Sequence, residues 1–347
     1  MRAQLPFLEQ HHLKSKHKQM AQTGESAAFR FLRGTFYLWA IRIREVLPEL
    51  VAGPVPHVQG LGDVHIENFG TWRDKEGRLV WGANDVDEAT SMPYTQDLIR
   101  LTTSAALALD FHIPELAEDV VTGYRSQLES GARAFVLAEA DEHLWKLARE
   151  QTSNPRDWWQ KLQEKLEPLP EEVQSDVMDI LQASFPGTEV SQLGWHTRQA
   201  GMGSLGRPRI VVTGNWYGAR ICREAKAMLP SAWDWSSVTD QVAQPAERLL
   251  SSPYRASDPY AAIVDRWSIR RLAPDSDKIA IDMLQRSADQ RLLLRDMGSE
   301  LANIHLSDSA PDPLLQALPD DLDWLVDATK TMMRIVREDQ ERYAAAC

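Results

Sequence analysis

Hydrophobic residues recur at three- and four-residue steps through most of the chain, which is the spacing of amphipathic helices. The first helix that this pattern predicts should break at Arg33-Gly34 and end at Gly53-Pro54, because glycine and proline disfavour a continuing helix. We therefore expect a chain rich in helices. They are predicted at residues 26–52, 97–109, 114–150, 155–185, 279–305 and 313–346.

Shorter runs of apolar and β-branched residues, bounded by turn residues, predict strands. Two of these runs, residues 55–61 and 78–83, are expected to pair, so that the residues following each strand lie close together. The fold class predicted from both patterns is α+β. The remaining strand-like runs are residues 190–223, with a third strand at 219–224, and residues 263–264 and 267–271.

A glycine-rich segment, residues 201–206 (Gly-Met-Gly-Ser-Leu-Gly), lies in the strand-rich part. In a dinucleotide-binding fold a helix would begin at the last glycine. Here Pro208 and the β-branched run from Ile210 to Thr213 favour a strand instead. A glycine loop between two strands can cover nucleotide phosphates with its backbone N–H groups. The alternative is a plain hairpin with a flexible tip.

Two carboxylate-bearing segments follow the strands expected at 55–61 and 78–83. Asp63 and Asn68 lie in the first, and Asp85 and Asp87 end the second. In phosphoryl transfer one carboxylate orients or deprotonates the attacking hydroxyl, while an amide and another carboxylate hold Mg²⁺ against the phosphates. Mg²⁺ needs few protein ligands, because it keeps water and phosphate oxygens. We assign Asp63 to the hydroxyl, Asn68 and Asp85 to Mg²⁺, and Asp87 to a supporting or second-metal role.

Each of these residues taken singly has a simpler interpretation as a loop or turn residue. It is their order and separation that favours a site. Asp97, at the start of the next helix, is explained by helix capping alone. His65 either shapes the loop or is a packed histidine. The basic cluster within residues 10–20 is either a solvated helix face or a contact for phosphate or substrate, and Arg33 is a candidate partner for an acid of the first segment.

Composition narrows the classes of partner. The formal net charge of −12 argues against a nucleic-acid partner, since phosphate backbones are bound by Lys and Arg. Only Cys222 and Cys347 are present, which fits a reducing cytoplasm rather than a disulfide framework. No apolar run approaches the ~20 residues that span a bilayer, and residues 1–12 lack an apolar signal-peptide core. We expect a cytoplasmic protein without a membrane partner.

These segments together resemble known proteins. The acidic segments are similar to those of aminoglycoside phosphotransferase-like kinases, and the whole chain resembles the uncharacterised bacterial family called domain of unknown function 2252. The resemblance implies a protein kinase-like, two-lobed fold, and the family has no settled activity to carry over. The residues behind it are Phe31 to Thr35, Gly62 to Gly70, Asn84 to Glu88, Asp97 to Leu101, Gly201 to Gly206 and Arg270 to Leu272.

The order of the segments departs from an ordinary kinase, in which the glycine loop precedes the catalytic Asp. The resemblance therefore implies either that the segments are unrelated or that the chain is circularly permuted, and we favour permutation. Residues 1–190 would begin the helical lobe and contain the catalytic and metal-binding loops. Residues 191–273 would form a small β lobe, and residues 274–347 would complete the helical lobe. The helix ending at His305 resembles the one that leads into a phosphotransferase catalytic loop.

The resemblance also implies site roles. It makes Asp97 a brace for the catalytic loop and places a phosphate-binding lysine on the strand at 219–224, where this chain has Arg223. Lys226, three residues on, would point to the opposite strand face. Arg is not equivalent to Lys in reach or geometry. The residues expected to contact the nucleotide are Gly201, Gly203, Ser204, Gly206 and Arg223.

The leading hypothesis is an ATP- and Mg²⁺-dependent phosphotransferase acting on a hydroxyl of an unknown, small-molecule substrate. One alternative is an AMP transferase that modifies protein, which needs the same metal site. Another is a nucleotide-binding regulatory protein without catalysis, which Arg223 supports and the set Asp63, Asn68 and Asp85 opposes. A metal-dependent hydrolase is a weaker possibility, because no dense His/Asp ligand motif is present.

Overall fold

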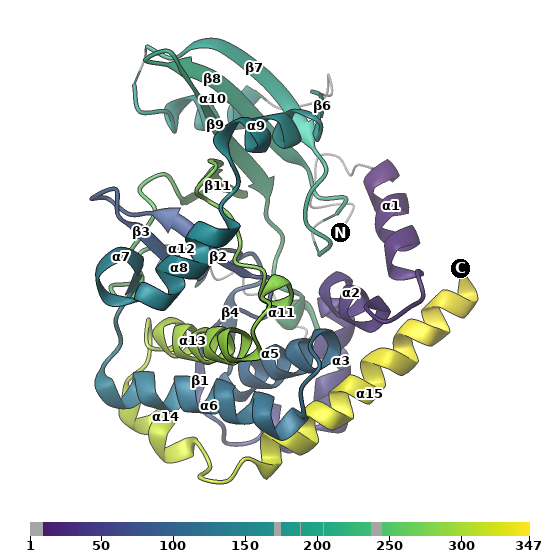
Figure 1. Cartoon of the computed structure of the whole chain (residues 1–347). Helices are drawn as coiled ribbons and strands as arrows, with labels where there is room; N and C mark the ends of the chain where they lie inside the picture. Colours follow the sequence, from purple (N-terminus) through teal and green to yellow (C-terminus); the bar gives the residue numbers. More distant parts are fainter. Residues whose placement is uncertain (1–9, 170–174, 188, 204, 237–244) are drawn as a thin grey trace.

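The computed structural model describes residues 10–169, 175–187, 189–203, 205–236 and 245–347. These residues form a mixed α+β structure with two parts (Figure 1). One part, called here the sheet region, is built on a six-stranded antiparallel sheet, and the other, the helical region, is mainly α-helical. No helix among the described residues is both long and apolar enough to cross a bilayer.

The helical region is built around three long helices that pack on one another. Their apolar faces share one hydrophobic core, to which Leu98, Val120 and Leu301 contribute fully buried side chains. These helices are α5 (Tyr94–Ala108), α6 (Ile113–Ser130) and α13 (Ser287–His305). The short 3₁₀ helix η1 (Ile281–Met283) precedes α13 within the stretch 279–305 expected to be helical.

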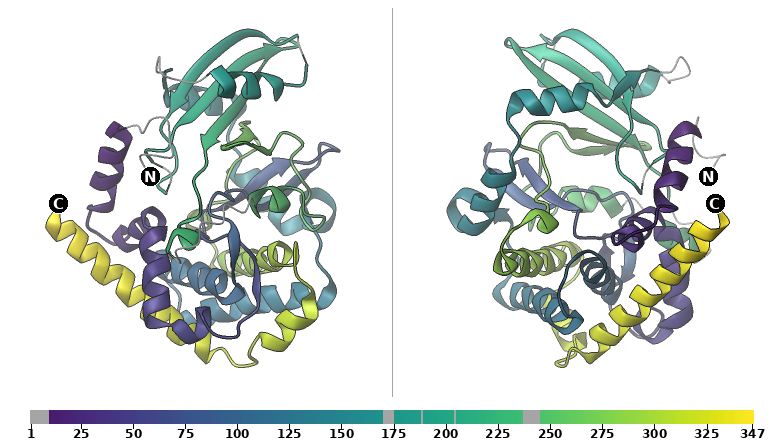
Figure 2. Two further views of the ribbon diagram at one scale, coloured as in Figure 1. Left: turned by 180° about the vertical axis from the view of Figure 1, so that it is seen from behind. Right: turned by 45° about the vertical axis from the view of Figure 1, so that its right-hand side comes forward.

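The first predicted helix is broken as the sequence indicates, with Thr35 separating α2 from α3. Its pieces and the C-terminal helices surround the three central helices (Figure 2). They are α2 (Ala27–Gly34), α3 (Phe36–Val46), α4 (Pro48–Val51), α14 (Pro311–Ala317) and α15 (Asp323–Ala346). The N-terminal helix α1 (Gln10–Met20) lies beside the end of α15, where the rings of His17 and Tyr343 stack.

Two small antiparallel sheets carry the acidic segments. The strand β1 (His57–Gly60) pairs with β4 (Thr90–Pro93), and β3 (Leu79–Ala83) pairs with β2 (Phe69–Arg73) and the two-residue β5 (Phe135–Val136). The expected pairing of the first two predicted strands is therefore wrong. β3 pairs with β2, its neighbour in the chain, and β1 pairs with β4, which lies beyond β3; β2 and β4 are short strands that the hydrophobic pattern did not reveal.

The large sheet has the strand order β10-β11-β9-β8-β7-β6. Its strands alternate between two faces, as the two-residue period of a strand requires. Ile210, Val212, Ala225 and Ala227 pack on one face against α10, whereas Val211 and Cys222 pack on the other against α9. The strands are β6 (Leu166–Pro168), β7 (Ser191–Arg198), β8 (Arg209–Trp216), β9 (Ala219–Ala227), β10 (Ala262–Val264) and β11 (Trp267–Arg271).

The helices α9 (Pro155–Gln163) and α10 (Ser175–Ala183) thus pack with the sheet region. The boundary expected at residue 190 assigned them to the helical lobe, but the change from helical region to sheet region falls before α9. The short helices α7 (Leu137–Ala140) and α8 (Glu142–Gln151) precede α9 in the chain. After β9 the chain forms α11 (Ala232–Ser236) and α12 (Pro245–Leu250), and then β10 and β11.

Candidate functional site

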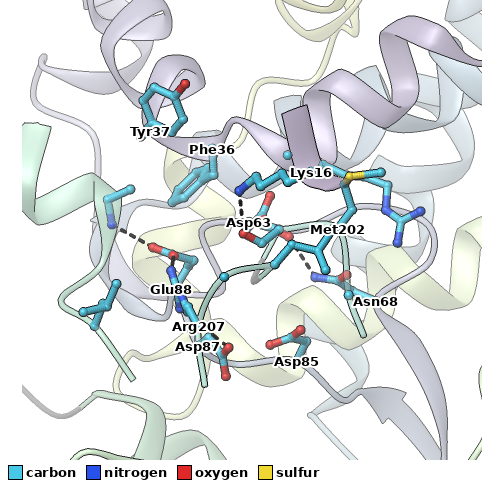
Figure 3. A pocket seen from close by; sticks show the side chains of 18 of the residues that line it. Lys16, Phe36, Tyr37, Asp63, Asn68, Asp85, Asp87, Glu88, Met202 and Arg207 are labelled. Atoms are coloured by element: carbon cyan, nitrogen blue, oxygen red, sulfur yellow. Dashed lines mark hydrogen bonds and ion pairs between the residues drawn. The ribbon is translucent and has the colours of Figure 1, made fainter. Parts of the chain in front are cut away.

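A cavity of about 720 Å³ lies where the sheet region meets the helical region. Its volume is within the ~300–1,000 Å³ typical of small-molecule sites. Its walls come from α1, α2, α3, the loops that follow β1 and β3, the segment between β7 and β8, and the start of α11. Figure 3 shows the acidic residues Asp63, Asp85, Asp87 and Glu88 gathered around it. The structure thus brings together segments that are more than a hundred residues apart.

Asp63 lies in the loop after β1 and is held by a buried arginine. Arg100 of α5 forms an ion pair with its carboxylate and also donates to the carbonyl oxygen of Leu32 at 2.9 Å. The rings of Phe36 and Trp39 lie 4.9 Å from the Arg100 guanidinium. Burial raises the pKa of Asp63 to about 6, although Arg100 opposes the shift. A carboxylate with such a pKa is suited to accept a proton near neutral pH.

The loop carrying Asp63 is braced from α5. The Asp97 carboxylate accepts the backbone N–H groups of Leu61 at 2.7 Å and Gly62 at 3.0 Å. The ring of His305, the last residue of α13, lies 3.3 Å from the same carboxylate. Asp97 is the fourth residue of α5, whose N-cap position is occupied by Pro93. Of the two roles considered for Asp97, the structure supports the brace.

Asn68 and His65 fix the shape of the same loop. The Asn68 amide group donates to the carbonyl oxygen of Asp63 at 2.7 Å, which leaves its own oxygen without a hydrogen bond to the described residues. His65 is buried edge-on against Phe29, and its Nδ1 accepts the backbone N–H of Glu67. Burial, with Arg33 nearby, lowers the pKa of His65 well below its usual value. His65 is therefore a neutral residue that shapes the loop.

Asp85 and Asp87 follow β3 and both contact Lys226 of β9. The Lys226 amine lies 3.0 Å from one oxygen of Asp85 and forms an ion pair with Asp87. Burial alone would raise the pKa of Asp85, but Lys226 and Arg270 hold it well below its usual value. Burial lowers the pKa of Lys226, and Asp85 opposes this shift. An acid of the helical region thus meets a cation of the sheet region beside the cavity.

Neither Arg223 nor Lys226 is part of the cavity wall, but Lys226 contacts acids of that wall, whereas Arg223 is directed elsewhere, contrary to the expectation that Arg223 contacts the nucleotide. Its guanidinium lies 4.2 Å from the ring centre of Tyr260 and 5.4 Å from that of Phe185, and it donates to the carbonyl of Ser184. Residues three apart on a strand point to opposite faces, and the face of Arg223 is the one that α10 covers. Lys226, on the other face, is the cation that sequence reasoning missed.

Further arginines line the sheet side of the cavity. Arg209 and Arg270 pair with the buried Glu224 at 2.7 Å, and Arg198 also forms an ion pair with it. These arginines hold the pKa of Glu224 well below its usual value against the effect of burial. Arg207 forms an ion pair with Glu88 at 2.6 Å. The alternation of Glu224 and Lys226 with Ala225 and Ala227 was the sequence signal that one face of β9 is polar.

The glycine-rich segment between β7 and β8 lines the cavity through Gly201, Gly203 and Gly206, whereas Ser204 lies outside the described residues. A Cβ on Gly203 would lie 3.1 Å from Asp63 Oδ2, so the backbone of this segment approaches Asp63 closely. Gly206 has a φ of +93°, and a Cβ there would lie 2.3 Å from Leu13 of α1. Glycine is required at position 206 by its positive φ, whereas a Cβ at position 203 would be tightly packed.

The basic cluster contributes one side chain to the cavity. Lys16 of α1 donates to the carbonyl oxygen of Gly203 at 2.8 Å, and Figure 3 shows its amine beside Asp63. Burial, with Arg207 nearby, lowers the pKa of Lys16 to about 8. Lys14 is exposed, as a solvated helix face predicts. Arg33, as considered from sequence, pairs with an acid of the loop, Glu67, at 2.9 Å.

The donor set fits Mg²⁺ better than a transition metal. Among the described residues no group of three or more His, Cys, Asp or Glu side chains is arranged to hold a metal ion. Mg²⁺ does not need one, because one or two carboxylates and phosphate oxygens suffice. The free oxygen of Asn68 and the carboxylate of Asp85 are hard donors on the cavity wall. Asp87 fits less well, because Lys226 and Arg207 already neutralise it.

Comparison with known proteins gives one match. Residues 9–178 match the model of a family described as "Uncharacterized protein conserved in bacteria (DUF2252)". The match supports the resemblance to that uncharacterised bacterial family, and it covers the loops that carry Asp63, Asn68 and Asp85. No curated protein and no solved structure gives a significant match. The function must therefore be argued from the site itself.

Proposed function

We propose that this protein is an ATP- and Mg²⁺-dependent phosphotransferase that acts on a hydroxyl group of a small-molecule substrate. The observation that carries the proposal is the contact of Lys226 with Asp85 beside a cavity that also contains Asp63 and Asn68. A lysine on the second strand after a glycine loop, next to a metal-binding acid, is the arrangement that binds nucleotide phosphates in kinases.

Each residue has a role that its surroundings support. Asp63 accepts the proton of the substrate hydroxyl, with Arg100 and Asp97 fixing its position. Asn68 and Asp85 would hold Mg²⁺, which when bound neutralises phosphate charge. Lys226 would turn from Asp85 toward the phosphates as nucleotide enters. Gly201, Gly203 and Gly206 would cover the phosphates with their backbone.

The proposed reaction is a single displacement at the terminal phosphorus. The substrate oxygen forms a bond to the γ-phosphorus, and the bond from that phosphorus to the β,γ-bridging oxygen breaks. The hydroxyl proton passes to a carboxylate oxygen of Asp63, and ADP leaves with the electron pair of the broken bond. Positioning and charge stabilisation supply most of the rate in this chemistry.

We further propose that the chain is a circularly permuted kinase-like fold. Three features support this: a glycine segment between β7 and β8, the lysine on β9, and α13 ending at His305 beside the brace Asp97. In this arrangement α13, which follows the β strands in this chain, would supply the helix that an unpermuted chain places before the Asp63 loop.

The first experiment is calorimetric titration of the wild type and Asp85→Ala with ATP, with and without Mg²⁺. We expect binding that requires Mg²⁺ and weakens at least tenfold in the variant, because a metal ligand is lost. Asp327→Ala, on an exposed part of α15, is the control and should bind as the wild type does. Absence of binding by the wild type at millimolar ATP would rule out the proposal.

Product analysis then separates the chemistries that share this site. Release of ADP during turnover supports phosphoryl transfer. Release of pyrophosphate, with AMP attached to a protein, identifies an AMP transferase instead. Nucleotide binding without either product, over a broad range of acceptor hydroxyls, supports a regulatory protein.

A further inference from the structure

Lys16 occupies a particular place in the cavity. Its amine donates to the carbonyl oxygen of Gly203 in the glycine-rich segment, at 2.8 Å. Burial and Arg207 lower the pKa of Lys16, and Asp63 is close enough to oppose this shift. Lys16 therefore lies beside both the segment proposed to cover the phosphates and the carboxylate proposed to receive the hydroxyl proton (Figure 3).

Lys16 also differs from the other cations of the cavity wall. Arg33 pairs with Glu67, Arg207 with Glu88, and Arg209 and Arg270 with Glu224. Within the described ranges, Lys16 forms no ion pair and has only the neutral carbonyl of Gly203 as a partner. Lys16 is partly buried, and Asp63 and Glu88 are near enough to oppose the lowering of its pKa without forming an ion pair with its amine. A ligand anion could form the direct charge pair that the other cations already have.

The glycine-rich segment must move before a phosphate can reach Asp63. The position of a Cβ on Gly203 is only 3.1 Å from Asp63 Oδ2 and 3.1 Å from the carbonyl oxygen of Arg33. A phosphoryl group between Gly203 and Asp63 would therefore lift the segment. Lifting it breaks the hydrogen bond from Lys16, and frees the amine at the place where the terminal phosphoryl group arrives.

We propose that Lys16 of α1 binds the terminal phosphoryl group of the nucleotide, exchanging the Gly203 carbonyl for a phosphoryl oxygen. This inference rests on the proposed function, and it assigns to α1 a role in distinguishing a nucleoside triphosphate from a diphosphate. Lys226 contacts Asp85 and Asp87 at the metal side of the cavity, so the two lysines act on different parts of the phosphate chain.

A purely structural role for Lys16 makes a different prediction. If the lysine only ties α1 to the glycine-rich segment, its removal changes the affinity for ATP and ADP by the same factor. If the lysine binds the third phosphate, its removal weakens the binding of ATP and leaves the binding of ADP unchanged. The ratio of the two dissociation constants therefore separates the roles, whatever happens to overall stability.

The experiment is calorimetric titration of Lys16→Met and Lys16→Gln with ATP and with ADP, both with Mg²⁺. Gln can still donate to the Gly203 carbonyl, so this variant removes the charge while keeping the tie. We expect both variants to bind ATP at least tenfold more weakly and ADP within twofold of the wild type. Lys14→Met, on an exposed position of the same helix, should change neither.

Each result has one meaning. Equal changes for ATP and ADP, or no change for either, in a wild type that binds both would overturn the role of Lys16 and leave the proposed function standing. A wild type that binds no nucleotide would remove the proposed function and this inference together. Lys16→Arg provides a second check, because it keeps the charge and should retain preference for ATP over ADP.

Discussion

At the scale of single residues, the site depends on which face of a strand a side chain occupies. Arg223 and Lys226 are both cations of β9, but only Lys226 faces the acids after β3. Arg223 stacks on Tyr260 under α10, on the face that also carries Ala225 and Ala227. The choice between the two is geometric, because three positions along a strand reverse the direction of the side chain.

Substituting the two cations tests this assignment. Lys226→Met should weaken Mg²⁺–ATP binding at least tenfold in calorimetry, since it removes a charge beside the phosphates. Arg223→Met should leave the affinity within twofold, because its guanidinium lies on the far face of the sheet. The reverse pattern would return the phosphate-binding role to Arg223.

Asp63 gives the stability a pH dependence with a defined sign. Its pKa in the folded protein is about 6, raised mainly by burial from 3.8, so the folded state holds this proton more tightly than the unfolded state. The contribution of Asp63 to stability therefore falls as pH rises from 4 to 6. In urea unfolding, the stability of wild type minus that of Asp63→Asn should fall by about 1–3 kcal/mol over this interval. A difference independent of pH would contradict the shifted pKa.

At the scale of elements, the loop that carries Asp63 is held in place by α5 rather than by the strand β1 that precedes it. Asp97 receives two backbone N–H groups of the loop, and Arg100, one turn later, holds Asp63. One helix thus fixes both the backbone and the carboxylate of the loop, which explains why Asp97 and Arg100 are charged yet fully buried.

Disrupting the hydrogen bonds from the loop to Asp97 should lower the stability of the folded protein. Asp97→Asn replaces one acceptor oxygen with an N–H donor next to the N–H groups of Leu61 and Gly62, and we expect a loss of about 1–3 kcal/mol in stability. The matched control is Asp308→Asn. Asp308 also accepts a backbone N–H, that of Gln59 in β1, but it is exposed, so the change should stay within about 0.5 kcal/mol. Chemical unfolding measures both, and equal losses would show that Asp97 has no special role.

The packing of α1 on the glycine-rich segment can be tested in the same way. Gly206→Ala introduces both backbone strain at positive φ and a clash with Leu13. Gly77→Ala has similar strain, with a φ of +75°, but no neighbour within 4 Å of the new Cβ. Gly206→Ala should therefore be less stable than Gly77→Ala by about 1–2 kcal/mol in thermal unfolding. Equal losses would show that Leu13 yields without cost.

At the scale of the whole molecule, the cavity is shared by the sheet region and the helical region. Lys226–Asp85 and Arg207–Glu88 join the two regions directly. A ligand in the cavity contacts both regions and should stabilise them as a unit, because it binds the folded chain and not the unfolded one.

Nucleotide binding should therefore raise the unfolding temperature of the entire protein. With Mg²⁺–ATP at 100 times its dissociation constant, linkage adds about 2.7 kcal/mol. Calorimetric scanning should show one transition that moves upward with ligand concentration. In Asp85→Ala, the shift at the same ATP concentration should be smaller, and a shift of the same size would contradict the role of Asp85.

The sequence by itself determined the local features. Helical periodicity located α5, α6 and α13, the break at Thr35 followed from Arg33-Gly34, and the run after Pro208 correctly indicated the strand β8 after the glycine segment. It also pointed to Asp63, Asn68, Asp85 and Asp87, all of which line one cavity. These features depend on residues a few positions apart, so they are visible in the order of residues.

The tertiary structure decided which strands pair, which helices pack on the large sheet and which side chains point toward the cavity. It paired β1 with β4 rather than with β3, placed α9 and α10 on the sheet, and turned Lys226 rather than Arg223 toward the acids. It also brought Lys16 to Gly203, 187 positions away. Such choices depend on contacts between distant segments, whose energies are settled by the packing of the whole chain rather than by any local pattern.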